Sequence, residues 1–188
     1  MSCFEHTMLV LAESVTSQDP LVSFACICHD LGKKVVFEKY GKLHGHEEAG
    51  VAVINSFCDR FRVPNEYRSV AIMAALYHSK IHNIRSLRAT TIVDMFVNTG
   101  AIRDPSTFKR MLQVCYHDAM GRGGDRREYD NHLYTEFLLN GIISMDIKSI
   151  SADAISKGMK GEQIGKYIRD KRVFHMKQLI QRKLDGTT

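Results

Sequence analysis

Apolar residues recur along the chain at intervals of three and four positions, which places them on one face of an α-helix. One such segment carries Val51, Ile54, Cys58 and Phe61. The two-residue alternation typical of strands is absent, except in residues 33–42 (KKVVFEKYGK), where we expect a short loop or hairpin. The pattern therefore predicts an all-α fold.

Prolines and glycines mark the ends of several expected helices. The pairs Asp19-Pro20 and Asp104-Pro105 each offer an acidic N-cap residue followed by a proline at the first helical position. Gly32 follows the first of these helices and is a natural C-terminal stop. The helices that we expect cover residues 3–15, 20–31, 46–62, 64–79, 88–97, 105–121, 130–143, 151–157 and 161–184.

Composition limits the class of protein. The chain has 188 residues, of which 44% are hydrophobic, enough for one compact domain with a real core. It has no apolar run of ~18 residues, so we expect no transmembrane helix. The five cysteines are odd in number and lie in apolar surroundings, which indicates reduced thiols in a cytoplasmic protein. A zinc site at Cys26 and Cys28 is disfavoured because no second cysteine pair follows.

The positive charge is concentrated near the C-terminus. The net charge is +5, yet residues 157–183 alone carry a local +7. A basic tail of this kind is typical of phosphate-contacting surfaces, although a solvated helix face is an equal alternative. The residues that we expect to contact RNA are Lys160, Lys166, Arg169 and Arg172. The same helix could instead pack closely against another through its small residues.

A pair of adjacent polar residues ends the apolar segment 24–34 (FACICHDLGKK). Burying the His29 imidazole beside the Asp30 carboxylate is costly unless something positive holds both. A divalent metal ion would do so, and helical bundles build such sites from His and acidic residues on separate helices. Because neighbouring helical residues diverge by about 100°, these two can share an ion only at a helix end. The ligand types suit manganese, iron, cobalt, nickel, zinc or magnesium.

Three separated segments complete a known pattern. His6, the pair His29-Asp30 and Asp118 resemble the H…HD…D motif of the HD-domain phosphohydrolases. More specifically, nearly the whole chain resembles the C-terminal region of bacterial CCA-adding tRNA nucleotidyltransferases. The segments that carry this likeness include EHTMLVL, FACICHDLGK, HGHEEAG, RFRVPNEYRSVA, LYHSKIH, MLQVCYHDAMGRGG and KGMKGEQIGKYIRDKR, in that order.

The resemblance implies a domain organisation. It predicts an all-α HD-domain helical bundle with a basic C-terminal helical tail. Residues 1–124 would form the phosphohydrolase core, and residues 125–188 the helices that complete the domain. The segment 121–131 (GRGGDRREYDN) would be a flexible turn between them. The family's nucleotidyltransferase head has no counterpart here, so we expect no CCA addition by this chain alone. We expect a natural stand-alone protein, a fragment of a larger enzyme being the alternative.

The resemblance also assigns roles. His6, His29, Asp30 and Asp118 would bind the metal ion, and Asp30 would also act as a general base toward the attacking water. Lys33 and His46 would complete the catalytic set, Lys33 by stabilising negative charge and His46 by contacting phosphate or protonating the leaving group.

Further polar residues are expected to contact the substrate. This set comprises Lys33, His44, His46, His78, His82 and Arg122. His78 and His82 are four residues apart and share a helical face, so a second metal site is the alternative for them. The alternative for Lys33 is a solvated lysine after a helix end, and the alternative for the histidines of LHGHEEAG is a plain histidine at a helix N-terminus. His117 is expected to be structural, and His132 and His175 are left unassigned.

These features predict a metal-dependent phosphohydrolase. The resemblance implies action on 2′,3′-cyclic phosphates, 2′-nucleotides or other phosphomonoesters, including those at tRNA or RNA 3′ ends. Two alternatives remain: a non-catalytic HD module that binds RNA or a partner protein, and a nucleotide or deoxynucleotide phosphatase. The expected partner is a nucleotide or an RNA, and a homo-oligomer is left open.

Overall fold

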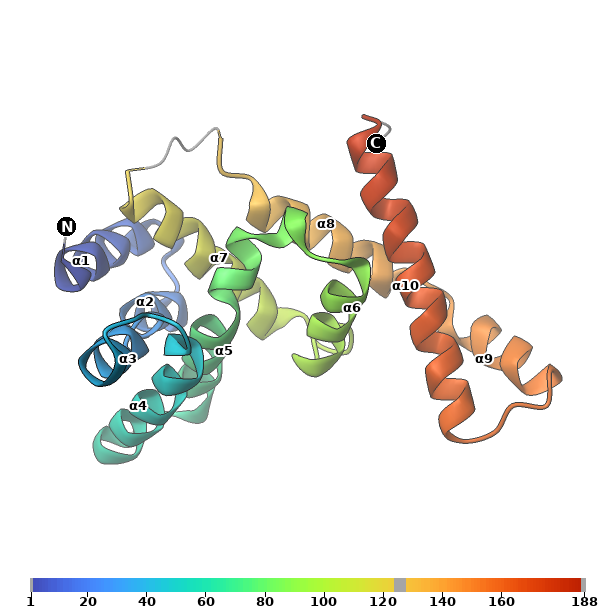
Figure 1. The fold of residues 1–188 in the computed structure, drawn as a ribbon, viewed down its shortest axis with the longest axis horizontal. Helices are drawn as coiled ribbons and strands as arrows, with labels where there is room; N and C mark the ends of the chain where they lie inside the picture. The colour runs from blue at the N-terminus through green and yellow to red at the C-terminus, as the bar shows by residue number, and fades with distance from the viewer. Residues whose placement is uncertain (1, 124–127, 187–188) are drawn as a thin grey trace. The chain divides into compact units, whose positions relative to one another are not determined.

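The computed structural model describes residues 2–123 and 128–186, and every regular element in those residues is a helix (Figure 1). The all-α fold predicted from the sequence is therefore confirmed for these residues. The α-helices are α1 (Cys3–Ser14), α2 (Pro20–Cys28), α3 (Gly32–Tyr40), α4 (His46–Phe61), α5 (Asn65–His82), α6 (Ala89–Asn98), α7 (Ser106–Gly121), α8 (Asn131–Ile143), α9 (Ile147–Ser156) and α10 (Glu162–Leu184). Short 3-10 turns cover Val15–Ser17 and Ile84–Ser86.

The helices group into two compact units. The first, here called the N-terminal unit, runs to Arg85 and resumes over Pro105–Leu133, so it holds α1 to α5 and α7. The second, here called the C-terminal unit, holds Ser86–Asp104 and the chain from Tyr134, which gives it α6, α9, α10 and most of α8. The division expected at residue 124 stays a prediction, and part of the expected turn, residues 124–127, lies outside the described residues.

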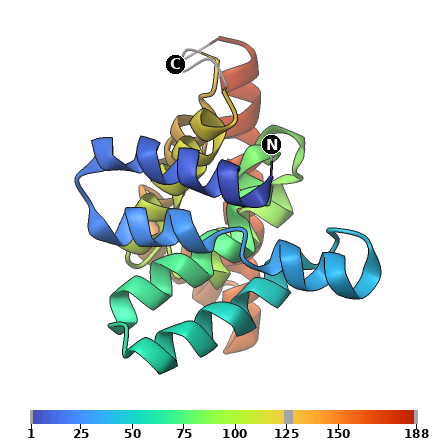
Figure 2. The same cartoon turned by 90° about the vertical axis from the view of Figure 1, so that its left-hand side faces the viewer.

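In the N-terminal unit, α5 is central and packs against α2, α4 and α7 (Figure 1). Helix α1 lies along α2 and α7, and α3 pairs with α4, as Figure 2 shows from the side. Gly121 permits the close approach of α7 to α1, because a Cβ atom there would lie 2.6 Å from Val10 Cγ2. Apolar side chains that fill this core include Val22, Ile54, Ile81, Phe108 and Met111.

Local capping explains where the first two helices begin. Ser2 and Glu5 form a reciprocal capping box at the start of α1. Asp19 Oδ1 accepts a hydrogen bond from the Leu21 amide at 2.9 Å, and Pro20 is the first residue of α2, as predicted. Helix α2 ends at Cys28, three residues before the expected end. The pair His29-Asp30 consequently lies in the turn between α2 and α3.

The prediction of a loop or hairpin at residues 33–42 is wrong, because this segment lies mostly within α3, which ends before Gly41 at φ +65°. The prediction that Gly32 stops a helix is also wrong, since Gly32 begins α3. Gly32 is required there for packing: a Cβ atom would lie 1.9 Å from the His46 carbonyl oxygen. The alternation of apolar and polar residues gave a wrong prediction here because Val35 and Phe37 are exposed, at 43% and 60%, and do not mark a buried face.

In the C-terminal unit, α10 packs against α6 and α9. Gly141 on α8 accommodates the Leu179 side chain of α10, which a Cβ atom would meet at 2.5 Å. Helix α9 starts at Ile147, four residues earlier than expected, because Asp146 caps it by accepting a hydrogen bond from the Ser149 amide at 3.1 Å. No described helix is both long and apolar enough to cross a lipid bilayer.

All five cysteines are free thiols. Four are buried, as expected, but Cys3 is exposed, so the expectation of a core position is wrong for this residue. Burial raises the pKa of the Cys26 and Cys28 thiols to about 12. Both thiols are therefore protonated at neutral pH in the ion-free protein.

Candidate metal centre

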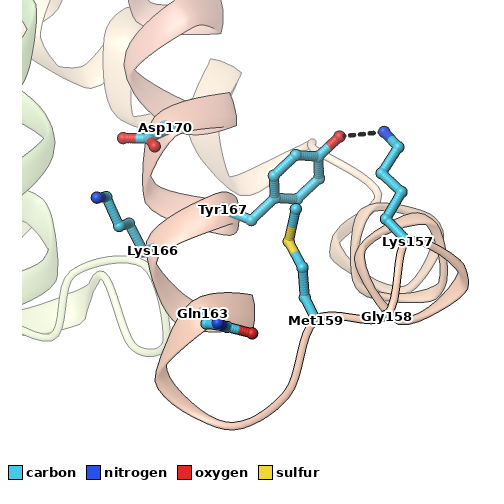
Figure 3. Close-up of a pocket in the computed structure, with 7 residues that line it drawn as sticks. All are labelled: Lys157, Gly158, Met159, Gln163, Lys166, Tyr167 and Asp170. Carbon is cyan, nitrogen blue, oxygen red and sulfur yellow. Dashed lines mark hydrogen bonds between the residues drawn. The ribbon is translucent and has the colours of Figure 1, made fainter.

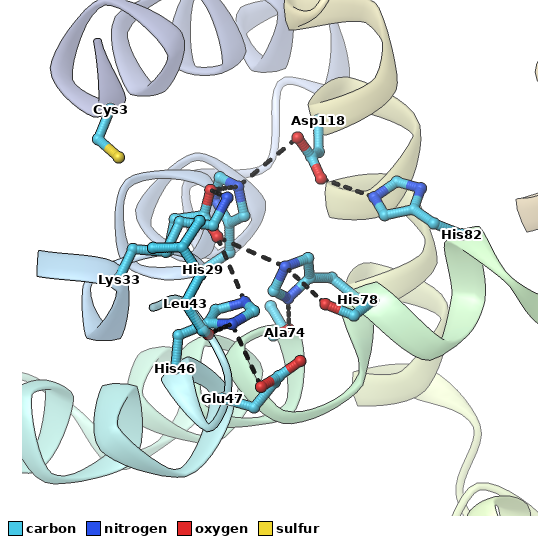
Figure 4. A network of polar contacts seen from close by, with 12 residues as sticks. Cys3, His29, Lys33, Leu43, His46, Glu47, Ala74, His78, His82 and Asp118 are labelled. Atoms are coloured by element: carbon cyan, nitrogen blue, oxygen red, sulfur yellow. Dashed lines mark hydrogen bonds and ion pairs between the residues drawn. The ribbon is translucent and has the colours of Figure 1, made fainter. Parts of the chain in front are cut away.

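Four side chains expected to bind metal lie on three parts of the N-terminal unit. His6 projects from the first turns of α1, His29 and Asp30 from the turn after α2, and Asp118 from the last turn of α7. All four are buried. Figure 4 shows His29 and Asp118 within the polar network that joins these elements.

The structure brings these four residues together. His6 Nε2 lies 2.9 Å from Asp118 Oδ1 and 3.9 Å from Asp30 Oδ2. His29 Nε2 lies 3.3 Å from Asp30 Oδ2 and 3.7 Å from Asp118 Oδ1. Imidazole nitrogens and carboxylate oxygens from sequence positions more than a hundred residues apart therefore surround one small volume. Here and below, these four residues are called the candidate metal centre.

Two further histidines approach Asp30 from the other side. His78 Nε2 and His46 Nε2 lie 3.5 and 3.8 Å from Asp30 Oδ1. His6, His29 and Asp30 form one group of potential ligand atoms lying within 4.8 Å of one another, and Asp30, His46 and His78 form another. The carboxylate of Asp30 thus lies between two pairs of imidazoles.

Hydrogen bonds to backbone carbonyls fix three of these rings. The Nδ1 atoms of His29, His46 and His78 lie 2.8, 2.9 and 2.9 Å from the carbonyl oxygens of Cys26, Leu43 and Ala74. Because a carbonyl oxygen can only accept, each Nδ1 carries a proton and donates it. The lone pair of a neutral ring is then on Nε2, which faces the carboxylates. Metal-binding histidines are commonly oriented in this way.

Several buried polar atoms of this cluster have no hydrogen-bond partner among the described residues: both ring nitrogens of His6, the Nε2 atoms of His29 and His46, and Asp30 Oδ1. Even the short approach of His6 Nε2 to Asp118 lies outside hydrogen-bond geometry. Leaving such atoms unsatisfied costs about 1–3 kcal/mol each. A divalent cation bound among them would remove this cost, so the residues present fit the ion that the sequence motif implies.

The charges also suit a cation. Burial alone would raise the pKa of Asp30, but His29, His78 and Lys33 outweigh it and hold that pKa well below its usual range. Burial is likewise outweighed at Asp118, whose pKa is lowered by its contacts with His29 and His82. Both acids are therefore carboxylates at neutral pH.

The two histidines of the candidate metal centre differ in their proton affinity. Burial lowers the pKa of His6. Burial acts in the same direction on His29, but the nearby carboxylates of Asp118 and Asp30 outweigh it and raise the pKa of His29 to about 9. In the ion-free protein, a proton on His29 therefore partly balances the two carboxylates.

Two basic side chains expected to contact substrate pair with these carboxylates. Lys33 Nζ lies 2.6 Å from Asp30 Oδ2. Arg122 donates from Nε and Nη2 to the two oxygens of Asp118, each at 3.0 Å. The Arg122 side chain is 47% exposed, whereas that of Asp118 is fully buried. Both cations lie at the candidate metal centre, one on each acid.

His82 lies at the far side of Asp118. Its Nε2 atom is 2.6 Å from Asp118 Oδ2, and its Nδ1 atom is 2.9 Å from the Tyr129 hydroxyl. His82 and His78 thus contact different carboxylates, although they share one face of α5. Sequence reasoning did not anticipate Tyr129, which lies within the segment assigned to a turn and offers no motif of its own.

The other candidate histidines lie elsewhere. His44 is exposed, and no polar contact among the described residues joins it to the candidate metal centre. Glu47 was not anticipated, yet its Oε2 atom lies 3.2 Å from His46 Nδ1, and the run HGHEE at the start of α4 was the available signal. His117 is buried on α7 beside the Tyr116 ring, and His132 stacks on the ring of Tyr129. His175 is half-buried on α10.

The four basic residues expected to contact RNA differ in exposure. Lys160 and Lys166 are exposed, and Lys166 borders a cavity of about 510 Å³ that is also lined by Lys157 and Tyr167 (Figure 3). Arg169 instead makes a bidentate pair with Asp94 of α6, at 2.7 and 2.8 Å. Arg172 is half-buried, with an Nε atom that lacks a hydrogen-bond partner among the described residues. Only the two lysines are freely presented to a ligand.

Comparison with known proteins agrees with this geometry. The HD domain family model matches residues 4–111. Relatives with the name Multifunctional CCA protein include that of Dechloromonas aromatica, 36% identical over 178 residues, that of Haemophilus influenzae, 34% over 184, and that of Legionella pneumophila, 34% over 177. Each alignment covers 93% of this chain but only 42 or 43% of the relative, so the chain spans less than half the length of these proteins.

No solved structure gives a significant match to this chain. The family match covers more than half of the residues and includes His6, the His29-Asp30 pair and both histidines that approach Asp30 from the other side. The resemblance inferred from the sequence motifs is confirmed, and the chain belongs to the HD domain family.

Proposed function

We propose that this chain is a metal-dependent phosphohydrolase in which His6, His29, Asp30 and Asp118 bind the ion. One observation carries the proposal: buried ring nitrogens of His6, His29 and His46 and the Oδ1 atom of Asp30, from three separate elements, converge without a hydrogen-bond partner among the described residues. Such a cluster would destabilise the fold unless a cation bound there. Membership of the HD domain family supports the same function.

A divalent ion held by these residues would supply positive charge to a phosphoryl oxygen and make water more acidic. The protein supplies the other elements of the reaction. Asp30 is ionised, and its Oδ1 atom has no hydrogen-bond partner among the described residues, so it can accept a proton from an attacking water. The burial of these groups strengthens their electrostatic effect on the reacting phosphate.

Lys33 and His46 lie where they can act on the phosphate. The Lys33 side chain is 18% exposed and its ammonium already lies at Asp30, so a small movement would bring it to a phosphate oxygen. His46 starts α4, and its Nδ1 proton is held by the Leu43 carbonyl. Its Nε2 atom is therefore the one available to exchange a proton with the leaving oxygen.

The proposed substrates are 2′,3′-cyclic phosphates, 2′-nucleotides and related phosphomonoesters, either free or at an RNA or tRNA 3′ end. The relatives named Multifunctional CCA protein support a link to tRNA. The exposed lysines Lys160 and Lys166 support a polymeric substrate, because lysine side chains commonly contact the nucleic-acid backbone. The N-terminal unit would then carry the reaction, and the C-terminal unit would contact the polymer.

A screen of metal ions against substrates tests the proposal. Purified protein is stripped with a chelator and then supplied with one divalent ion at a time. Each form is assayed on 2′,3′-cyclic AMP, 2′-AMP, deoxynucleoside monophosphates and a generic phosphomonoester. We expect hydrolysis to disappear on chelation and to return with at least one ion. Turnover restricted to deoxynucleotides would favour a deoxynucleotide phosphatase instead.

Two variants make the test specific. Asp30→Ala removes the carboxylate that faces both pairs of histidines, and we expect it to lower kcat by at least about a thousandfold. Asp59→Ala is the control, since Asp59 is an exposed acid paired with Arg68 on the surface. Retained turnover in a cooperatively folded Asp30→Ala protein would rule out the proposed centre. Absence of hydrolysis with every ion would favour a binding module.

A further inference from the structure

A mainly apolar pocket opens beside the candidate metal centre. It has a volume of about 480 Å³ and is formed by residues of α1, α2, α3 and α4 and of the turn after α2. Asp30 is one of its lining residues. The same residue therefore belongs to the pocket wall and to the candidate metal centre. Figure 4 shows Cys3, another residue of the pocket, with its thiol directed toward the centre.

The pocket walls expose side chains that folded proteins usually bury. Phe4 is 71% exposed, Met8 and Ile27 are each 38% exposed, and Val35 is 43% exposed. Leu31 and Val53 complete the apolar lining. A concave apolar surface of this size, next to a few polar groups, is typical of a small-molecule binding site.

We propose that this pocket binds the nucleobase of the substrate while the phosphate lies at the candidate metal centre. The inference rests on the proposed function and specifies the part of the substrate that has no assigned site. The position of the pocket supports this proposal. A phosphate ester whose phosphorus is attacked beside Asp30 must place its organic group in an adjoining space. The pocket is such a space, because Asp30 is one of its lining residues. A planar, largely apolar ring suits the phenylalanine, methionine and aliphatic walls.

The polar groups of the pocket indicate weak discrimination between bases. The Thr7 hydroxyl donates to the Cys3 carbonyl oxygen at 2.8 Å. Lys34 is exposed, and its Nζ atom lies 3.7 Å from Glu38 Oε1. Neither is a buried donor held toward the pocket. Without such groups a site cannot read the hydrogen-bonding edge of a base, so we expect adenine and uracil nucleotides to bind similarly.

A phenylalanine pair tests the proposal. Phe4→Ala removes a pocket wall, and Phe37→Ala removes an exposed phenylalanine of the same unit that does not line the pocket. Both side chains are largely exposed, so both variants should fold. We expect Phe4→Ala to raise the KM for 2′-AMP and 2′,3′-cyclic AMP about tenfold with little change in kcat. The KM for glycerol 2-phosphate, which has no base, should not change, and Phe37→Ala should behave as the parent protein.

Two further arms extend the test. A short oligonucleotide ending in the same 2′,3′-cyclic phosphate distinguishes an RNA end from a free nucleotide as the source of the base. Binding is also measured without turnover, in the metal-free protein, through alkylation of Cys3. Cys3 lines the pocket, and the other four cysteines are buried with raised thiol pKa values, so the reagent reports this site. Saturating 2′-AMP should slow the alkylation in the parent protein and not in Phe4→Ala.

The outcomes separate this inference from the proposed function. Equal KM values for the parent and Phe4→Ala on nucleotides, with no protection of Cys3, would overturn the nucleobase pocket while leaving hydrolysis intact. If 2′-AMP protects Cys3 from alkylation in the parent protein but not in Phe4→Ala, and neither protein hydrolyses any substrate, the pocket would be supported and the proposed reaction overturned. Equal rises in KM for nucleotides and glycerol 2-phosphate would assign Phe4 to the general structure of the centre and overturn its role toward the base.

Discussion

At the scale of single residues, Asp30 organises the candidate metal centre. Its Oδ2 atom faces His6, His29 and Lys33, and its Oδ1 atom faces His46 and His78. The Asp30 carboxylate can face all of these side chains only because α2 ends before it, at Cys28. Inside a regular helix, His29 and Asp30 would point about 100° apart.

The proton on His29 leads to a testable dependence on pH. The two carboxylates raise the pKa of His29 to about 9 in the ion-free protein, whereas its ordinary value is 6.5. A histidine must be neutral to bind a metal ion, so binding releases this proton. We expect the Kd for the divalent ion to fall about tenfold for each pH unit between pH 6.5 and 8. Calorimetric titrations in buffers of different protonation enthalpy would measure the released proton.

The same linkage fixes the sign of a stability change. Because the pKa of His29 is raised in the folded state, its stabilising contribution is present below pH 6.5 and lost as the pH rises through 9. The ion-free protein should therefore lose stability over this interval, and the ion-bound protein should not. His44→Ala serves as the control, since His44 is exposed and makes no polar contact with the centre among the described residues. A Kd for the divalent ion that stays constant with pH in the parent protein and in His44→Ala would contradict a protonated His29.

The sequence could predict which residues approach one another, but not all of their partners. His6, His29, Asp30 and Asp118 could be grouped because together they resemble the H…HD…D motif of a known family. Their roles as ligands stay a prediction. The pairing of Arg122 with Asp118 was not foreseen, because the direction of a long side chain depends on the packed neighbours and not on spacing alone.

At the scale of elements, α3 shows why short helices are difficult to predict. Its apolar residues are mostly exposed and give no helical stripe, and only Val36 among them is buried. Its first residue lies in close contact with α4. This information is tertiary, since Gly32 touches His46 and Gly50 from another helix.

That contact yields a stability prediction. Gly32→Ala would place a Cβ atom 1.9 Å from the His46 carbonyl oxygen and 2.5 Å from the Gly50 nitrogen, both backbone atoms that cannot turn away. We expect the free energy of unfolding to fall by about 3 kcal/mol, measured by urea denaturation. Turnover should fall further than stability explains, because α4 carries His46.

Gly165→Ala is the matched control for this substitution. Gly165 lies within α10, and no atom stands within 4 Å of an added Cβ. Replacing a helical glycine by alanine should stabilise the protein by about 0.5–1 kcal/mol. Similar stability of the two variants would mean that α3 and α4 are not in close contact at Gly32.

At the scale of the whole molecule, sequence order and spatial grouping differ. The segment Ser86–Asp104 groups with the C-terminal helices, and Pro105–Leu133 returns to the N-terminal unit. The ion pair between Asp94 and Arg169 is part of that grouping and joins positions 75 residues apart. Hydrophobic periodicity identifies such helices one at a time, but it carries no information on which of them pack together.

The exposure of the tail determines which residues can test RNA binding. Arg169 is engaged by Asp94 and Arg172 is half-buried, so substituting either would disturb the fold as well as the charge. Lys160 and Lys166 are exposed. If both contact phosphates, Lys160→Ala with Lys166→Ala should reduce the slope of log K against log salt by about 1.4 for single-stranded RNA. Filter binding over a salt series measures this slope.

Lys39→Ala with Lys42→Ala provides the control for net charge, because both lysines are exposed and lie in the N-terminal unit. This pair removes the same charge at a different place and should leave the slope unchanged. Hydrolysis of 2′,3′-cyclic AMP should be unaffected in both double variants, since a mononucleotide does not need the tail. Equal losses of slope in the two double variants would show that RNA responds to overall charge, and the tail would then have no specific role.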